Sequence, residues 1–243
     1  MCNREISDSK PADDDEEDKM ANIVHSLVTS IILDTKENAP KFNKDVKNYI
    51  LSRAGKHASK EILRKLEEAL DVSEKKTALF INERMLNFPV LVVPPSFQSF
   101  SQDVAGLAEP YKNIIYIQKI RIDEKKKDEG VATTSKIQAA SSSGGKKKKM
   151  GKAEKKRLAA ASLANAPIKF DNMEDALLFK LTEGTEEHFD FPVHMDVEPG
   201  SKFHITEEDG QKWVPYRRVV LMDQKRFNAF INRVATGEGC IEE

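Results

Sequence analysis

The chain has 243 residues, of which 33% are charged and 39% hydrophobic, and its 39 basic and 40 acidic side chains leave a formal net charge of -1. This length allows one domain with tails. The low hydrophobic share predicts that part of the chain lies outside any packed core. The balanced charge argues against a general nucleic-acid binder and against a uniformly acidic protein.

The charges are nevertheless segregated along the chain. Residues 1–18 hold eight acids against two bases, residues 121–160 hold thirteen bases against five acids, and residues 171–209 hold twelve acids against two bases. Blocks of this kind are typical of solvated tails and interaction surfaces.

Cysteine usage and hydropathy favour an intracellular protein that does not bind membranes. Cys2 and Cys240 stand at opposite ends, which predicts neither a disulfide framework nor a zinc cluster. The longest early apolar run, 23–33, is too short to span a bilayer and follows acids rather than a basic signal-peptide region.

The part before the lysine-rich region predicts alternating strands and helices. Residues 1–20 form an acidic disordered tail. The expected elements are then a strand at 25–33, a helix opened by Pro40 and stopped by Gly55, a helix capped by Ser59, an ambiguous segment at 78–86, a helix opened by Pro94 and Pro95, and a strand at 112–122. For the ambiguous segment, Pro89 and the run VLVVPP favour a strand that leaves the sheet over a helix.

The helical faces follow from apolar spacing. We expect the first helix to bury Phe42, Val46, Tyr49 and Ile50. The second has an apolar stripe from Ile62 to Leu70, and the third has Phe97, Phe100, Val104 and Leu107 on one side.

Residues 123–165 form a lysine-rich, low-complexity, disordered insertion with a short Lys/Ala helix near its end. After it we expect a helix capped by Asn172 with Asp175 at its third position, alternation at 186–195, a strand at 213–222, a helix capped by Asp223, and a frayed tail at 237–243. Residues 21–122 and 166–236 would each bury little core alone, which predicts one discontinuous α/β domain.

Three segments in order resemble one family. They are LFINERMLNFP at 79–89 with two prolines following, YKNIIYIQKIRI at 111–122 running into the insertion, and WVPYRRVVLM at 213–222 followed by a helix. The set resembles the BCCIP family, the BRCA- and CDKN-interacting proteins with yeast counterparts. The residues that match the family motifs are Glu83, Arg84, Asn87, Pro89, Pro94, Pro95, Trp213, Pro215, Arg217 and Arg218.

The resemblance implies a mixed sheet with flanking helices, similar to acetyltransferases but without the acyl-CoA site. It also implies a non-catalytic nuclear binding protein that shuttles with the cytoplasm. Roles in this family include chaperoning a large-subunit ribosomal protein, ribosome biogenesis, nuclear export of a lipid kinase, and binding of cell-cycle or DNA-repair proteins. Family members carry a further helical and strand segment before the part that matches residue 25, and we expect this chain to lack it.

The lysine tract is typical of a nuclear import signal. Its basic residues are Lys146, Lys147, Lys148, Lys149, Lys152, Lys155, Lys156 and Arg157. The alternatives are non-specific contact with a nucleic-acid backbone and a plain solvated linker. No aromatic residue lies between 123 and 165, so the tract offers no platform for stacking a base.

The acidic tail suggests a basic protein client, since carboxylates can replace RNA phosphates and steer such a client by charge. Its residues are Asp13, Asp14, Asp15, Glu16, Glu17 and Asp18. The acidic region 171–209 suggests the same, and the alternative is a tail that only aids solubility. A scaffold for cell-cycle or DNA-repair proteins is equally compatible with these charges.

Arg217 and Arg218 point to opposite faces of one strand, so at most one of them faces the core. A buried ion pair between this strand and the segment that holds Glu83 and Arg84 would satisfy the interrupting charges. The alternative is a partner-binding surface.

Cofactor and enzyme readings find no support in the sequence. His188, His194 and His204 have spacings that match no common zinc pattern, which predicts no metal. The chain has no phosphate-binding loop of the P-loop type and no nucleophile elbow. A site for the pyrophosphate of acyl-CoA would need glycines directly before a helix. The segment most similar to such a loop, 233–239, is followed by too few residues to form a helix. We expect no catalysis and no cofactor, with an acetyltransferase as the alternative from another class.

Overall fold

The fold is described from a computed structural model of the chain. The residues that it describes are 26–33, 39–71, 76–85, 88–106, 111–123, 166–181, 187–193, 205–208 and 210–240. The acidic tail, the lysine tract, Asn87, His194 and His204 lie outside these ranges.

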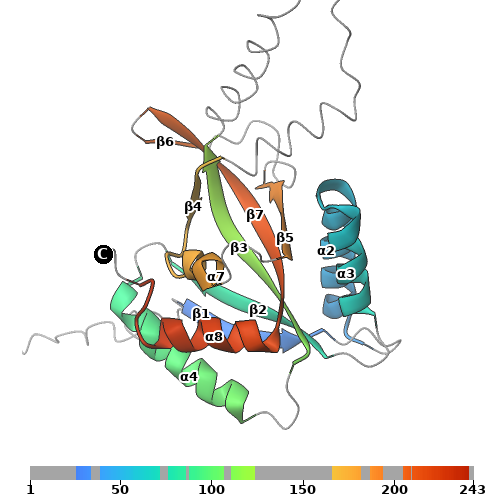
Figure 1. Ribbon diagram of the computed structural model, residues 1–243, viewed down its shortest axis with the longest axis horizontal. Helices are drawn as coiled ribbons and strands as arrows, with labels where there is room; N and C mark the ends of the chain where they lie inside the picture. Colours follow the sequence, from blue (N-terminus) through green and yellow to red (C-terminus); the bar gives the residue numbers. More distant parts are fainter. Residues whose placement is uncertain are drawn as a thin grey trace, which may run out of the picture.

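The described strands form one mixed sheet (Figure 1). The strands are β1 (Ser26–Ile32), β2 (Thr77–Arg84), β3 (Asn113–Asp123), β4 (Ile168–Phe170), β5 (Glu187–Pro192), β6 (Thr206–Glu208) and β7 (Gln211–Asp223). The main order is β1-β2-β3-β7-β5, with β4 paired to β3 and β6 paired to β7. The β2–β3 pair is parallel, whereas the other pairs are antiparallel.

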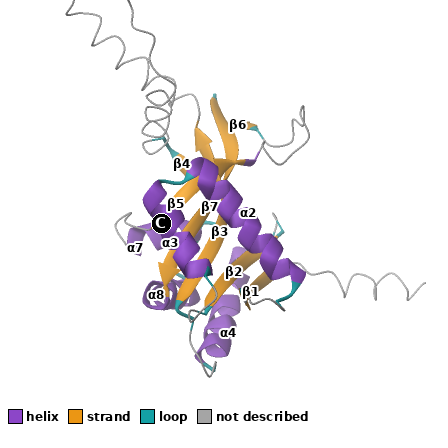
Figure 2. Ribbon diagram, turned by 90° about the vertical axis from the view of Figure 1, so that its right-hand side faces the viewer, coloured by secondary structure: helices purple, strands orange, loops and turns teal. Residues whose placement is uncertain are grey.

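Helices cover both faces of this sheet. The helical elements are α2 (Lys41–His57), α3 (Lys60–Leu70), the 3-10 turn η1 (Val90–Val92), α4 (Val93–Ala105), α7 (Asp175–Leu181) and α8 (Gln224–Ala235). Figure 2 shows α2 and α3 in front of the strands, with α4 and α8 on the other side. The α/β expectation of a mixed sheet with flanking helices is confirmed.

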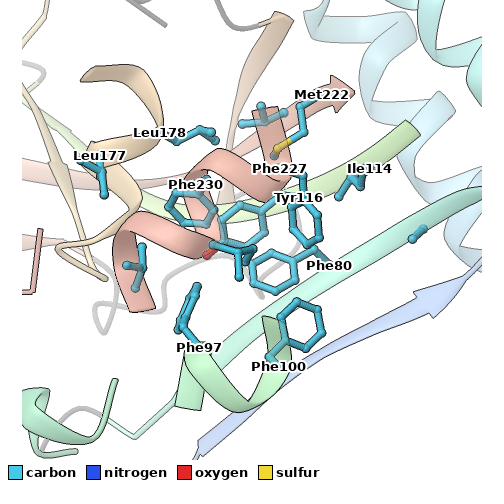
Figure 3. Close-up of a cluster of buried hydrophobic side chains, with 14 of the residues drawn as sticks. Phe80, Phe97, Phe100, Ile114, Tyr116, Leu177, Leu178, Met222, Phe227 and Phe230 are labelled. Carbon is cyan, nitrogen blue, oxygen red and sulfur yellow. The ribbon is translucent and has the colours of Figure 1, made fainter. Parts of the chain in front are cut away.

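Alternation along the strands divides the core between the two faces. In β3, Ile114 and Tyr116 face α4 and α8, and Ile115 belongs to the cluster under α2 and α3. The larger cluster is centred on Phe80, whose ring lies 4.9 Å from the ring of Tyr116 and 5.1 Å from that of Phe227 (Figure 3). Buried aromatic pairs at such distances favour edge-to-face packing.

Strands from both sides of residues 124–165 share the sheet. Ile122 pairs with Ile168, and the amide of Asp123 donates to the carbonyl of Pro167 at 3.2 Å. The chain therefore leaves and re-enters the fold at neighbouring points. β3 also pairs along its whole length with β7, which comes later in the sequence.

Several local expectations are confirmed. Ser59 caps α3 by accepting from the amide of Ile62 at 3.2 Å, and Asp223 caps α8 by accepting from the amide of Arg226 at 2.8 Å. The ambiguous segment at 78–86 lies in a strand up to Arg84. In these cases a signal within a few residues was sufficient.

Other local expectations are wrong. α2 continues through Gly55 to His57, and although Ile50 is buried as expected, Phe42 and Tyr49 are exposed because the buried face of the helix runs through Ile50 and Ala54. The run after Pro89 does not continue as an extended strand but forms η1 and enters α4.

Asn172 is not the N-cap of α7, since it lies three residues before the first helical residue, and its side-chain amide donates to the carbonyl of Asn82 at 3.3 Å. The helix instead begins at Asp175 itself.

The expected frayed tail also needs correction. Residues 237–240 form a turn in which Gly237 and Gly239 have positive φ values of 91° and 75°. This turn places Cys240 in the core next to α7, with 3% of its surface exposed. Desolvation by burial, with a smaller contribution from the charge of Glu174, raises the pKa of this thiol to about 11.

Candidate functional site

A buried polar network lies where β2 and β3 separate. The two strands pair only from Thr77 to Phe80, and further along β3 pairs with β4 instead. Polar side chains from β2, β3 and the start of α7 fill the space between them. They are Asn82, Arg84, Tyr116, Gln118, Glu174 and Asp175.

Glu174 is the anionic centre of this network. Its carboxylate accepts from both terminal nitrogens of Arg84, at 2.6 and 2.8 Å, and from the side-chain amide of Asn82 at 2.8 Å. The side chain of Glu174 is 1% exposed and that of Arg84 is 10% exposed. A buried carboxylate needs such compensation, because an unpaired buried charge is very costly. The pair therefore ties β2 to the segment that follows the insertion.

Asp175 is fully buried beside this pair. One carboxyl oxygen accepts from the hydroxyl of Tyr116 at 2.7 Å, and the other has no hydrogen-bond partner among the residues that the structure describes. Desolvation, and then the charge of Glu174, raises the pKa of Asp175 well above its ordinary value. Burial likewise raises the pKa of Tyr116. Burial thus favours the neutral forms of both groups inside the protein.

A second buried pair joins β7 to β5. Arg218 donates to both carboxylate oxygens of Asp190, at 2.7 and 2.8 Å, and both side chains are less than 10% exposed. The guanidinium also lies 4.7 Å from the centre of the Phe179 ring. Arg218 thus faces the core. The ion pair expected with the segment at 83–84 is wrong, because β3 separates β2 from β7.

The opposite side of these strands carries a basic sheet face, defined here as Lys119, Arg121, Lys169 and Arg217. Lys119 lies opposite Arg217, and Arg121 lies opposite Lys169. Like charges in directly opposed positions destabilise a sheet unless they are compensated.

Three of the four cations in the basic sheet face have acidic partners. Lys119 pairs with Glu83, Arg121 with Asp171 at 3.1 Å, and Lys169 with Glu208 at 2.6 Å. Arg217 has no carboxylate partner among the described residues, and its guanidinium donates to the carbonyl of Tyr216 at 3.5 Å. The face is therefore only weakly positive.

Most of the acids that the structure describes between 171 and 209 have partners within the fold. Glu174 and Asp190 are in the buried pairs, and Asp175 is buried beside them. Asp171 and Glu208 neutralise the basic sheet face, and Glu187 pairs with Lys65 on α3. Most of the acids that the structure describes in this region are therefore buried or paired within the fold.

The remaining motif residues have structural positions. Trp213 is 4% exposed, and the Lys169 ammonium lies 4.3 Å from its ring centre. Pro215 is buried on the same strand, whereas Pro89 and Pro95 are exposed around the start of α4. Pro94, in the first turn of α4, is half-buried.

A groove of about 370 Å³ lies between α4 and α8. Its lining combines polar and apolar side chains, and none of them is charged. They are Ser101, Val104, Ala105, Gln224, Phe227, Asn228, Ile231 and Asn232. This lining presents no cation to a phosphate-bearing cofactor.

Neither a metal centre nor a membrane span emerges from the described residues. In those ranges no three His, Cys, Asp or Glu side chains gather in a way that could hold an ion. No helix within the described part has the length and apolar character needed to cross a bilayer.

Comparison with known proteins identifies the family. The family model described as BCCIP matches residues 6–178. The chain belongs to the BCCIP family. It is 54% identical over 225 residues to a BCCIP homologue of Caenorhabditis elegans, covering 92% of this chain and 64% of the relative. It is 30% identical over 104 residues to a BCCIP homologue of Drosophila melanogaster, covering 43% of this chain and 34% of the relative.

A solved structure, that of BCP1 from Saccharomyces cerevisiae, aligns with 85% of this chain and 61% of its own length, at a TM-score of 0.42 and 14% identity. The chain thus spans less than two thirds of the length of each of these BCCIP relatives and of BCP1.

Proposed function

We propose that this BCCIP-family chain is a non-catalytic nuclear adaptor that holds a basic protein client, with a large-subunit ribosomal protein as the client class. It acts in ribosome biogenesis and in transport between nucleus and cytoplasm. The observation that carries the proposal is the family membership. The charge segregation in the sequence supplies the mechanism.

The fold supports a binding role. Glu174, Asp175 and Arg218 are the polar residues that most resemble catalytic groups, and all three are buried. Glu174 is paired with Arg84, and Arg218 is paired with Asp190. Among the described glycines, none directly precedes the first turn of a helix, as a pyrophosphate-binding loop requires. A calorimetric titration with acetyl-CoA tests this part, and micromolar binding would overturn it.

The acidic run Asp13–Asp18 is our main candidate for client contact, because most of the acids that the structure describes between 171 and 209 are paired or buried. Carboxylates attract a basic client over a distance set by ionic strength. The complex is therefore expected to weaken as salt rises.

Affinity purification of the tagged chain from nuclear extract, at moderate and at high salt, tests the client. We expect one dominant basic ribosomal protein that is lost at high salt. A matched variant with Asp13–Asp18 changed to Asn and Gln should lose it already at moderate salt. Equal recovery of the client by the parent chain and the variant would contradict the electrostatic mechanism. Recovery of cell-cycle or repair proteins in place of a ribosomal protein would favour the scaffold function.

The lysine tract is proposed to bind an import receptor. Changing the seven lysines and one arginine between 146 and 157 to Gln keeps the length of the segment and removes its charge. We expect this variant to move from the nucleus to the cytoplasm. Unchanged nuclear accumulation would refute the import role.

A further inference from the structure

β6 is a short strand at one end of the sheet. It pairs with β7 through three residues, Thr206, Glu207 and Glu208, and with no other described strand. Figure 1 shows it at the end of the sheet that is remote from α4 and α8. The side chains of Glu207 and Glu208 are exposed, and that of Thr206 is partly exposed. A strand held by so few pairs opens locally at small cost, so an enzyme can reach its hydroxyl group.

The hydroxyl of Thr206 lies on the same side of the sheet as the basic sheet face. Thr206 lies opposite Trp213, and Trp213 lies opposite Asp123. Directly opposed residues share a face of the sheet, and so do residues two apart in one strand, which places Thr206 on the face of Arg121. The guanidinium of Arg121 donates through Nη1 to Oγ1 of Thr206 at 3.2 Å and through Nε to Asp171 at 3.1 Å. Arg121 therefore already contacts the hydroxyl.

A second cation lies beside Thr206. The ammonium of Lys169 lies 4.3 Å from the ring centre of Trp213, the residue directly opposite Thr206. The same ammonium pairs at 2.6 Å with Glu208, which is two residues further along β6 and so on the face of Thr206. An anion attached to the Thr206 hydroxyl would thus have both a guanidinium and an ammonium nearby.

The residues after Thr206 suit one class of protein kinase. Glu207 and Glu208 occupy the next two positions, and both are exposed. Kinases select their substrates partly by charge, and a kinase with a basic substrate groove favours acids directly after the acceptor hydroxyl. The acids of β6 would therefore direct the kinase, and the cations on the face of Thr206 would receive the phosphate.

We propose that Thr206 is a phosphorylation site for an acidophilic protein kinase that uses MgATP. Oγ1 of Thr206 attacks the γ-phosphorus, the bond from that phosphorus to the bridging oxygen breaks to release ADP, and the catalytic carboxylate of the kinase takes the hydroxyl proton. The phosphate then accepts hydrogen bonds from Arg121 and competes with Asp171 for it. The basic sheet face with its three carboxylate partners has a net charge of about +1, and the phosphate changes it to about −1.

Incubation of the folded full chain with an acidophilic kinase and MgATP tests the site. We expect mass spectrometry of its peptides to locate a phosphate on Thr206. The variant Thr206→Val, which keeps a β-branched residue in the strand, should lack that phosphate. The double variant Glu207→Gln with Glu208→Gln should be modified about tenfold more slowly, because the charge attraction to the kinase is lost. A folded chain left unmodified at Thr206, or a double variant modified equally fast, would overturn the proposal.

Phosphorus-31 NMR tests whether the cations receive the phosphate, and the resonance missing from Thr206→Val identifies that of Thr206. The second pKa of a phosphothreonine is about 6. A nearby guanidinium favours the dianion, so this pKa should be about one unit lower in the folded chain than in urea. Arg121→Gln should raise it. Lys212→Gln should leave it nearly unchanged, because Lys212 lies opposite Glu207 and so on the other face. The same pKa in the parent chain and in Arg121→Gln would overturn the placement of the phosphate beside Arg121.

Discussion

At the scale of single residues, the two buried ion pairs link segments that lie far apart in the sequence. Arg218 and Asp190 are both less than 10% exposed and share two hydrogen bonds. The net value of such a buried pair is small against an apolar replacement, but removal of one partner leaves the other charge unpaired.

The first prediction follows from this asymmetry. Arg218→Ala should lower the free energy of unfolding by about 3–5 kcal/mol. The double variant Arg218→Met with Asp190→Leu should recover most of the loss. Urea denaturation measures both, and a double variant as unstable as the single one would show that the ring contact with Phe179, rather than the unpaired charge, dominates.

Asp175 provides the second prediction, on pH. Its pKa is raised in the folded state, mainly by burial, so the folded protein retains a proton that the unfolded chain releases. Stability therefore falls as pH rises from the unfolded pKa, near 3.8, to the raised folded pKa, by up to about 1.4 kcal/mol per pH unit. Above the folded pKa this loss is complete.

Asp175→Asn removes this titration and keeps an oxygen that can accept from Tyr116. Its stability relative to the parent chain should therefore rise with pH through the same window and then level off. Denaturation midpoints measured at several pH values test this. A stability difference that does not change with pH would mean that Asp175 titrates alike in both states.

At the scale of elements, the C-terminal turn fastens α8 to α7. Gly239 has a φ of 75°, and a Cβ placed there would lie 3.3 Å from the Cβ of Leu177. Gly210, between β6 and β7, has a φ of 70° but open space around the same position. A substitution at Gly210 therefore introduces backbone strain alone, whereas a substitution at Gly239 introduces backbone strain and a steric contact with Leu177.

Alanine at each of these glycines gives the third prediction. Gly210→Ala should cost about 1–2 kcal/mol, the penalty of left-handed backbone alone. Gly239→Ala should cost more, because Leu177 must also move. Thermal unfolding measures the difference, and equal losses would show that the turn shifts freely.

At the scale of the whole molecule, β3 and β4 pair with each other in the sheet although residues 124–165 separate them in the sequence. The amide of Asp123 donates to the carbonyl of Pro167, so a short turn can join β3 to β4. Replacement of 124–165 by about four turn residues should leave a folded domain. A tenfold shorter loop raises stability by up to about 2 kcal/mol through loop-closure entropy. Loss of cooperative unfolding would mean that the replaced residues supply core contacts.

The sequence by itself determined the elements whose signals are local. The isoleucine-rich strand at 112–122, the Ser59 and Asp223 caps and the apolar stripe of α8 all depend on residues within a few positions of one another. The motif order also indicated the family before any fold was known.

Only the tertiary structure decided which charges meet. Arg84 pairs with Glu174, which lies ninety residues later in the sequence, and Arg218 on β7 pairs with Asp190 on the neighbouring strand β5. Strand order places these carboxylates, and periodicity carries no information about strand order. For the same reason the acids of 171–209 looked available in the sequence, whereas most of those in the described fold are buried or paired.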